Sequence, residues 1–561
     1  MFVNKENVNI LTSLLIEHGV RRAVVCPGSR NAPIVHNLNE CGSIECYPVT
    51  DERSAGFYAL GMSLADDAPV AVCVTSGTAL LNLSPAVAEA TYQHHGLIVI
   101  SADRPSAWIG QLDGQTLHQP GAFGCFVSKS VNLPEPHDDI ERWHCKRLVN
   151  EALTAVTTDG RMSVHINVSI SEPLFEFSVP ELPVIPKVNC VRAVLDTDAF
   201  KQCVLSRMSA AKRPMLVVGQ VNRENDRVED ALNRIGKHVV VLSEPLSSGT
   251  QRLADFALAS IGDAADYSPD FLLYVGDTIV SKRVKQFIRN ADIAEAWAVC
   301  EDGDIHDTFM CQTGVVKGSP TEALMSLSSY LEESSSVNLR QGNDYVNRWN
   351  KLIDEVCKCA WSYEPRYSQM AAVREFELSL CDMDYTWNVH FANSNAIRLA
   401  CIYASHHVWC NRGVNGIEGS LSTAAGFSVA DRQSVVFCVI GDLSFFYDQN
   451  ALWNTNLCGN LRMILLNNSC GGIFYSLGGL RESAAFDGLV TAHHDTDAKG
   501  ICAQNDIGYL SAKNMEELRW GLATLMTASP KRPMLLEVFT DAEDDKRAIS
   551  DFMKYIRNEG K

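Results

Sequence analysis

Two apolar runs in the C-terminal third of the chain constrain the fold more than any other feature. The first, VVFCVIG, begins at Val435 and leads into Asp442, and the second, MILLNN, begins at Met463 and ends at Asn468. Both are short and uncharged, which is typical of strands buried on both faces of a parallel sheet. A helix between them would bring both strands to the same sheet edge, where α/β folds bind ligands. We therefore expect Asp442 and Asn468 to lie side by side.

Bulk composition is that of an ordinary globular chain with a negative charge balance. Its 561 residues are too many for one core and predict about three or four domains by the usual size range. The net charge of −19 argues against nucleic acid or an anionic membrane as the main partner. No apolar run approaches the ~20 residues that cross a bilayer, and no signal peptide is recognisable. These features predict a cytoplasmic protein that holds any anionic substrate with local basic residues.

The nineteen cysteines do not follow a disulfide or zinc-binding pattern. They are scattered, and the chain contains no C-x-x-C pair. The nearest neighbours, Cys41 with Cys46 and Cys357 with Cys359, lack the spacing of a metal knuckle. Reduced thiols, mostly in the core, are therefore expected, and a structural zinc site is not.

Strand-like and helix-like runs alternate along the whole chain. This pattern predicts an α/β protein with three doubly wound parallel-sheet domains. The expected domains span residues 1–180, 189–335 and 345–561. The proline-rich segment 178–188 is the predicted linker between the first two, and a polar stretch that begins near Tyr330 separates the last two.

Asp442 and Asn468 offer the hard oxygen ligands that Mg²⁺ or Mn²⁺ prefers, and such ions usually bridge to phosphate. A helix that begins after Asp442 would turn its free N–H groups toward the same phosphate. The alternative is that the aspartate caps a helix and the asparagines close a turn. Gly276 and Asp277 also end a strand-like run, without a following asparagine pair, so half of the pattern is weak evidence. The complete pattern favours a metal–diphosphate site.

This GD…NN pattern resembles the fingerprint of thiamin diphosphate-dependent enzymes. Longer motifs resemble one branch, the 2-succinyl-5-enolpyruvyl-6-hydroxy-3-cyclohexene-1-carboxylate synthases of menaquinone biosynthesis. They occur in the family's order over essentially the whole chain and include CPGSRNAPIVH, TDERSAGF, SADRP, DGQTLHQPGAF, SKRVKQF, NSNAIR and NRGVNGIEG. The resemblance implies a pyrimidine-binding domain, a central domain without its own cofactor, and a diphosphate- and metal-binding domain. It also implies a homodimer or dimer of dimers with active sites between subunits.

The resemblance further implies a transferase, a carboligase that uses thiamin diphosphate with Mg²⁺ or Mn²⁺. Its substrates would be 2-oxoglutarate, which is decarboxylated, and isochorismate, which receives the succinyl carbanion equivalent by 1,4-addition. Glu52 would bond to the pyrimidine ring of the cofactor and tune its electronics. The alternative reading of Glu52 is an acidic residue stabilised by a helix N-terminus. Because the product carries three carboxylates, this acidic chain must gather positive charge in one pocket.

The resemblance implies the other site residues by their positions in the matching motifs. The expected catalytic residues are Ser29, Arg30, Glu52, Arg104, Gln115, Lys282, Ser394, Arg398 and Arg412. The expected cofactor-binding residues are Glu52, Ile417, Gly441, Asp442, Leu443, Ser444, Asn468, Ile473 and Phe474, and the expected metal ligands are Asp442, Asn468 and Cys470. Arginine suits two-point contact with a carboxylate, although a single arginine near a turn is more often a solvated charge.

Some positions depart from the family pattern or stay open. Cys470 follows the asparagine pair where relatives commonly carry a Gly-rich run, and its carbonyl can bind a metal provided that φ is negative. Asn415 replaces a small hydroxyl residue. His493 and His494 lie in a polar stretch and are expected to be solvated or part of a lid rather than metal ligands.

Two other functions compete with this prediction. One is another thiamin diphosphate-dependent 2-oxo acid decarboxylase or carboligase, but a small neutral acceptor would not need five basic residues. The other is a non-catalytic relative that acts as a binding module. That reading expects the loss of Glu52 or Asp442, and both residues are present.

Overall fold

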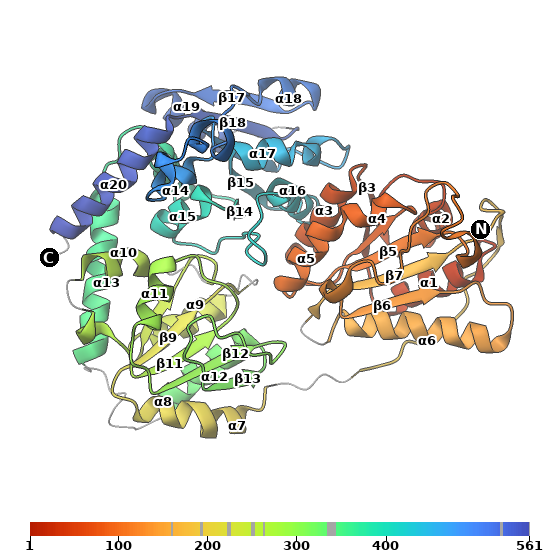
Figure 1. Cartoon of the computed structure of the whole chain (residues 1–561), viewed down its shortest axis with the longest axis horizontal. Helices are drawn as coiled ribbons and strands as arrows, with labels where there is room; N and C mark the ends of the chain where they lie inside the picture. The colour runs from red at the N-terminus through yellow and green to blue at the C-terminus, as the bar shows by residue number, and fades with distance from the viewer. Residues whose placement is uncertain are drawn as a thin grey trace.

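Three parallel β-sheets with helices on both faces make up the chain (Figure 1). The structure is a computed structural model that describes residues 1–158, 161–190, 195–221, 226–247, 253–261, 264–333, 344–527 and 531–559. The sheets contain six, five and five strands in chain order. The predicted α/β class with three parallel-sheet units is confirmed.

The N-terminal sheet has the strand order β3-β2-β4-β5-β7-β6. Its strands are β2 (Arg22–Val25), β3 (Glu45–Pro48), β4 (Ala71–Val74), β5 (Ile98–Asp103), β6 (Lys129–Leu133) and β7 (Val164–Ser169). Its helices are α1 (Glu6–Glu17), α2 (Ala32–Glu40), α3 (Glu52–Asp66), α4 (Thr78–Asn82), α5 (Ser84–Tyr92) and α6 (Asp139–Ala155), and β1 (Phe2–Val3) pairs with β8 (Phe177–Val179). Val24 and Val25 pack into different core layers, as expected of a strand covered on both faces. The strand order reverses between β2 and β4, so Ser29 and Arg30, which follow β2, lie where such sheets bind ligands.

The central sheet has the order β10-β9-β11-β12-β13. Its strands are β9 (Pro214–Val218), β10 (Val240–Ser243), β11 (Phe271–Val275), β12 (Glu295–Cys300) and β13 (Gly314–Lys317). Its helices are α7 (Thr197–Phe200), α8 (Ser206–Ala210), α9 (Asp226–Ile235), α10 (Ala254–Ser260), α11 (Lys282–Arg289) and α12 (Pro320–Glu333). Residue 335, the predicted end of this domain, lies outside the described residues.

The C-terminal sheet has the order β14-β15-β16-β18-β17. Its strands are β14 (Trp387–Phe391), β15 (Val435–Gly441), β16 (Leu461–Asn467), β17 (Gly508–Ala512) and β18 (Met534–Phe539). Its helices are α13 (Asp344–Ser362), α14 (Gln369–Leu380), α15 (Asn395–Tyr403), α16 (Ser420–Ala430), α17 (Asp442–Tyr447), α18 (Lys499–Gln504), α19 (Met515–Thr527) and α20 (Ala542–Glu559). Gly441 at the end of β15 is paired with Leu466 of β16, so both strands end at one sheet edge.

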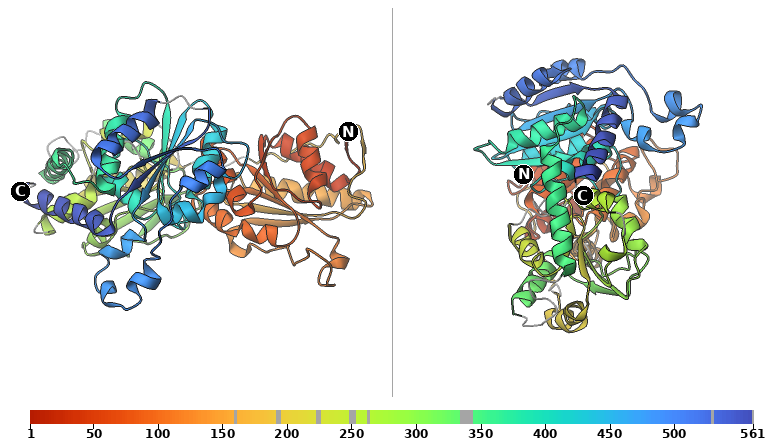
Figure 2. Two further views of the ribbon diagram at one scale, coloured as in Figure 1. Left: turned by 90° about the horizontal axis from the view of Figure 1, so that it is seen from above. Right: turned by 90° about the vertical axis from the view of Figure 1, so that its left-hand side faces the viewer.

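The N-terminal and C-terminal sheets are joined through a close crossing of α3 and α16. A side chain at Gly61 would place its Cβ 2.0 Å from the carbonyl oxygen of Thr423, and one at Gly426 would come within 2.2 Å of the carbonyl oxygen of Tyr58. Only glycine lets the two backbones approach this closely. The central sheet shares a buried apolar cluster with the C-terminal sheet instead. From above, the N-terminal sheet occupies one end of an elongated molecule (Figure 2).

Two expectations about the whole chain can be compared with the structure. None of the helices in the described ranges combines the length and apolar character that crossing a bilayer requires. All nineteen cysteines are free thiols, but the prediction that most lie in the core is wrong. The fully buried ones are Cys26, Cys73, Cys145, Cys300, Cys410, Cys438, Cys470 and Cys502.

Candidate active site

The Asp442 carboxylate organises the edge where β15 and β16 end. It is 4% exposed, and its Oδ1 accepts a hydrogen bond from the Leu443 N–H at 2.7 Å. Its Oδ2 accepts from the N–H groups of Asn468 at 3.1 Å and Cys470 at 3.2 Å. Asp442 and Asn468 therefore lie side by side, as the strand pattern predicts. The helix that follows is shorter than the apolar run suggests, since α17 ends at Tyr447.

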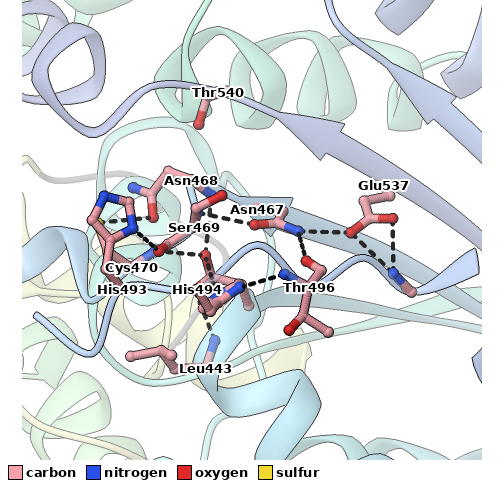
Figure 3. A network of polar contacts seen from close by, with 12 residues as sticks. Leu443, Asn467, Asn468, Ser469, Cys470, His493, His494, Thr496, Glu537 and Thr540 are labelled. Carbon is pink, nitrogen blue, oxygen red and sulfur yellow. Dashed lines mark hydrogen bonds and ion pairs between the residues drawn. The ribbon is translucent and has the colours of Figure 1, made fainter.

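Asn467, the last residue of β16, and Asn468, which follows it, have different surroundings (Figure 3). Asn467 turns inward, where its Nδ2 donates to Oε1 of the fully buried Glu537 at 2.8 Å. Asn468 donates its Nδ2 to Oδ2 of Asp545 at 2.9 Å. Among the described residues, the one contact of its amide oxygen is a long one of 3.9 Å from the Cys470 thiol. Asp545 thus orients the Asn468 amide and leaves its oxygen available to an ion.

Cys470 has the backbone conformation that the expected metal-ligand role needs. The left-handed residue of the loop is Ser469, with φ +62°, whereas Cys470 is not among the residues with positive φ. The Cys470 carbonyl accepts a hydrogen bond from the Gly472 N–H at 2.9 Å and retains a second lone pair. Together the Asp442 carboxylate, the Asn468 amide oxygen and this carbonyl form an all-oxygen set suited to Mg²⁺ or Mn²⁺.

The histidine pair has a more specific place than the sequence predicts. The Ser469 carbonyl lies 2.7 Å from His493 Nδ1 and accepts from the His494 N–H at 3.0 Å (Figure 3). His494 is not solvated, because its side chain is only 15% exposed and its Nε2 lies 3.5 Å from Asp442 Oδ2. Its Nδ1 accepts from the Thr496 N–H at 3.1 Å, so the ring proton of the neutral form is on Nε2. The Asp442 carboxylate raises the pKa of His494.

Space for a ligand is present beside this oxygen cluster. A Cβ built on Gly441 would meet no atom within 4 Å, so the backbone before Asp442 is open. Ile417 is 41% exposed although it is apolar, which suits a side chain that packs on a ligand. Ser444 is buried, while Leu443, Ile473 and Phe474 are partly buried. The residues present fit a metal-bound diphosphate with an apolar group next to it.

Glu52 begins α3, and its carboxylate Oε2 accepts a hydrogen bond from Asn82 Nδ2 at 3.0 Å. The N-cap of this helix is Asp51, whose side chain accepts from the Ser54 N–H at 3.1 Å. The same Asp51 accepts from Asn450 of the C-terminal sheet unit at 2.7 Å. Glu52 therefore lies at a boundary between two sheet units.

Within one chain, this boundary lies at the far end of α17 from the oxygen cluster. Arg53 donates to the carbonyl of Tyr447, the last residue of α17, at 2.8 Å. Asp442 is the first residue of the same helix. The start of α3 therefore contacts the end of α17 that is opposite Asp442.

The expected substrate residues of the N-terminal sheet form one group. Arg30 is 6% exposed and donates to the Ile170 carbonyl and to Glu172, both at 3.0 Å. Arg104 pairs with Asp113 at 2.9 Å. Ser29 and Gln115 are exposed. The forks of both arginines are thus already oriented by contacts in the chain.

The remaining expected substrate residues form a second group between the central and C-terminal sheets. Arg412 Nη1 donates to Asn393 Oδ1 at 3.1 Å, and its buried Nε has no hydrogen-bond partner in the described part of the chain. Arg398 on α15 and Lys282 at the start of α11 are exposed, and Ser394 precedes α15. Burial lowers the pKa of Lys285, and the positive charges of Arg412 and Lys282 lower it further. The sequence did not single out Lys285, yet it lies in the same basic patch.

Several buried carboxylates support the site and were missed from the sequence. Glu89 of α5 accepts from the backbone N–H groups of Gly413 and Val414 at 2.8 and 2.7 Å, which fixes the loop after Arg412. Burial raises the pKa of Glu89, and it raises that of Asp545 to about 6. Glu537 could have been recognised from the sequence, because it is a charged residue within the apolar run MLLEVF. Glu89 and Asp545 lie in helices where acidic residues are common, so nothing in the sequence distinguishes them.

Within one chain, the two groups of substrate residues belong to different sheet units. Among the described residues, no hydrogen bond or ion pair links the first group to the second. The first group comprises Ser29, Arg30, Arg104 and Gln115, and the second comprises Lys282, Ser394, Arg398 and Arg412.

Comparisons with known proteins identify relatives over the full length. Residues 6–122 match the family model described as "Thiamine pyrophosphate enzyme, N-terminal TPP binding domain". The chain is 41% identical over 572 residues to the 2-succinyl-5-enolpyruvyl-6-hydroxy-3-cyclohexene-1-carboxylate synthase of Phocaeicola vulgatus, with 100% of both chains covered. The synthases of Bacteroides thetaiotaomicron and Porphyromonas gingivalis are 40% and 32% identical, covering 99% and 100% of this chain and 100% and 98% of their own.

Full-length identity at this level, together with the matched N-terminal model, shows which family the sequence represents. The chain therefore belongs to the family of 2-succinyl-5-enolpyruvyl-6-hydroxy-3-cyclohexene-1-carboxylate synthases and is a thiamin diphosphate-dependent enzyme.

Proposed function

We propose that the chain decarboxylates 2-oxoglutarate and adds the resulting succinyl unit to isochorismate, giving 2-succinyl-5-enolpyruvyl-6-hydroxy-3-cyclohexene-1-carboxylate and CO₂. The observation that carries the proposal is the oxygen cluster of Asp442, Asn468 and Cys470 at the ends of β15 and β16. It lies in a chain that matches the family from end to end.

Bound thiamin diphosphate would supply a carbon that adds to a keto group after losing its proton, and a positively charged ring that takes up the electron pair left behind when CO₂ departs. Mg²⁺ or Mn²⁺ on the oxygen cluster would hold its diphosphate. Glu52 would accept a hydrogen bond from the pyrimidine ring, and Ile417 would pack against the cofactor. The N-terminal sheet unit is then the pyrimidine-binding domain, the C-terminal unit binds diphosphate and metal, and the central unit has no cofactor of its own.

Charge supports dicarboxylate substrates. The protein carries −19 overall, so an anionic substrate must be held by local positive groups. Arg412, Lys282 and Lys285 gather such charge, and Arg398 on α15 adds a further exposed positive group. Each arginine–carboxylate contact can contribute ~1.5–3 kcal/mol as a charge-assisted hydrogen bond. Ser29, Gln115 and Ser394 are polar neighbours suited to orienting the acids.

An omission series tests this function directly. The purified protein is incubated with Mg²⁺, thiamin diphosphate, 2-oxoglutarate and isochorismate, each left out in turn, and the product is identified by mass. The named product should form only in the complete mixture. Product formation with pyruvate in place of 2-oxoglutarate at equal efficiency would move the chain to another thiamin diphosphate-dependent carboligase.

Replacement of Arg398 by Ala should narrow the preference for 2-oxoglutarate over pyruvate. Pyruvate shares the reacting keto acid but lacks the distal carboxylate, so only 2-oxoglutarate loses a contact. The expected loss in kcat/KM for 2-oxoglutarate is ~10- to 100-fold, which corresponds to one charge-assisted hydrogen bond. Arg398→Lys should recover part of it, because a point charge replaces a planar fork.

The matched control is Arg547→Ala on α20, an exposed arginine paired with Asp544. It should leave both donors unaffected. Equal penalties on 2-oxoglutarate and pyruvate in the Arg398 variant would instead show that Arg398 supports the cofactor or the fold.

We also propose that two copies complete each active site. Within one chain, the start of α3 contacts the end of α17 opposite Asp442, and the two groups of substrate residues have no direct link among the described residues. A second copy that brings its N-terminal sheet to the oxygen cluster would unite Glu52 with Asp442. A symmetric dimer would then contain two equivalent sites.

Mixing two inactive variants tests this arrangement. If sites form between chains, co-expression of Glu52→Gln with Asp442→Ala should restore roughly a quarter of wild-type activity, because half of the dimers are mixed and each has one intact site. If each chain builds its own site, the mixture stays inactive. Each variant expressed alone is the control.

A further inference from the structure

We propose that Cys300, Asp302 and His306 form a binding site for a thiophilic divalent cation of the Zn²⁺ class, separate from the oxygen cluster at Asp442. Cys300 ends β12, and Asp302 and His306 follow it with the spacing C-x-D-x₃-H. The spacing of cysteine pairs predicted no zinc site, because it says nothing about a single cysteine combined with other ligand types. The structure brings one cysteine together with a carboxylate and an imidazole.

The three side chains already face one another. His306 Nε2 lies 3.0 Å from Asp302 Oδ2, and one ligand atom from each of the three residues lies within 4.8 Å of the other two. A tetrahedral zinc ion separates its nitrogen, oxygen and sulfur ligands by ~3.3–3.8 Å, given bond lengths of about 2.0–2.3 Å. Rotation of these side chains is enough to close the cluster around an ion.

The backbone holds the cluster in place. Cys300 is the last residue of β12, and its position in the sheet is fixed by pairing with Lys317 of β13. The Asp304 N–H donates to Asp302 Oδ1 at 2.9 Å, which leaves Oδ2 for His306. Gly303, with φ +79°, allows the tight turn that this bond closes.

The loop that carries the cluster is acidic. The loop EDGDIHD, residues 301–307, contains four carboxylates and no lysine or arginine. The cysteine sulfur is buried, whereas the His306 side chain is 53% exposed, so an ion can enter from solvent and keep a water ligand. Burial raises the pKa of the Cys300 thiol to about 12, so an incoming ion must displace the thiol proton.

The donor types decide the class of ion. Mg²⁺ prefers oxygen ligands only, whereas thiolate and imidazole select Zn²⁺ and its neighbours in the transition series. The oxygen cluster at Asp442 and the Cys300 cluster should therefore bind different classes of metal ion within one chain. A bound ion would hold the loop that connects β12 to β13 in one conformation.

Co²⁺ is a suitable probe because a thiolate ligand gives it a charge-transfer absorption in the near ultraviolet. The full-length protein, reduced and freed of metal, is titrated with Co²⁺ in the presence of excess Mg²⁺ that occupies the oxygen cluster. We expect one equivalent of Co²⁺ to produce the absorption, and stoichiometric Zn²⁺ to abolish it. Zn²⁺ should also raise the thermal midpoint of unfolding.

Three variants complete the test. Cys300→Ser should remove the absorption, and His306→Ala, at an exposed position that does not threaten folding, should weaken Co²⁺ binding by at least ~10-fold and cancel the thermal shift. Cys311→Ser, a thiol of the same connection outside the cluster, is the matched control and should bind as wild type. The absence of absorption in the wild type, or its persistence in both Cys300→Ser and His306→Ala, would overturn the proposal.

Discussion

The Glu52→Gln variant is expected to lose turnover by at least ~10²-fold at saturating thiamin diphosphate, while its fold stays intact. Glutamine has the size of glutamate but lacks the charge that favours the imino tautomer of the pyrimidine ring. Asn82 can donate to the amide oxygen as it now donates to Oε2. Asp51 still caps α3 through the Ser54 N–H. The loss should therefore appear in kcat and not in stability.

Steady-state kinetics and thermal unfolding measure the two parts of this expectation. The free energy of unfolding should change by less than about 0.5 kcal/mol, as for other substitutions that leave caps and core intact. Glu40→Gln, an exposed carboxamide substitution at the end of α2, is the matched control and should retain full activity. Near-normal turnover of Glu52→Gln would exclude Glu52 as the pyrimidine-binding carboxylate.

In the Asp442→Ala variant, the affinities for Mg²⁺ and thiamin diphosphate should fall together, each by ~100-fold or more. Asp442 is the only anionic ligand of the proposed metal set. Because metal and cofactor bind cooperatively, the factor by which the metal strengthens cofactor binding equals the factor by which the cofactor strengthens metal binding, so both affinities fall when that cooperativity is lost. The carboxylate also accepts three backbone N–H groups, from Leu443, Asn468 and Cys470. Its removal therefore loosens the loop that carries the other two ligands.

Asp442→Asn separates the two causes in part, because its single amide oxygen can still accept the N–H groups of Asn468 and Cys470, whereas the charge and the acceptor for the Leu443 N–H are lost. Calorimetric titration of thiamin diphosphate, with and without Mg²⁺, should show a lower cofactor affinity in both variants. The decrease should be larger in Asp442→Ala than in Asp442→Asn. Asp506→Asn, at an exposed left-handed position that asparagine tolerates, is the control. Unchanged cofactor affinity in Asp442→Asn and Asp442→Ala would place the metal elsewhere.

Local apolar runs mark the strands that lie inside the sheets and fail to mark two of the edge strands. The interior strands β4, β9, β11 and β15 are apolar throughout because helices cover both of their faces, so composition alone reveals them. The edge strand β6 alternates exposed and buried residues, and the edge strand β3 has no buried residue. Neither contains a continuous apolar run, so the sequence pattern does not mark them, because an edge strand depends on its neighbour more than on its own sequence.

The sequence by itself determined the α/β class, the three sheet units and the meeting of Asp442 with Asn468, because parallel strands joined by a helix must end at one edge. It did not show what orients the two asparagines, since Asn467 is held by Glu537 of β18 and Asn468 by Asp545 of α20. Only tertiary structure placed His494 against Asp442 and Lys285 beside Arg412. Contacts between residues distant in sequence leave no local pattern, because each partner satisfies the rules of its own helix or loop.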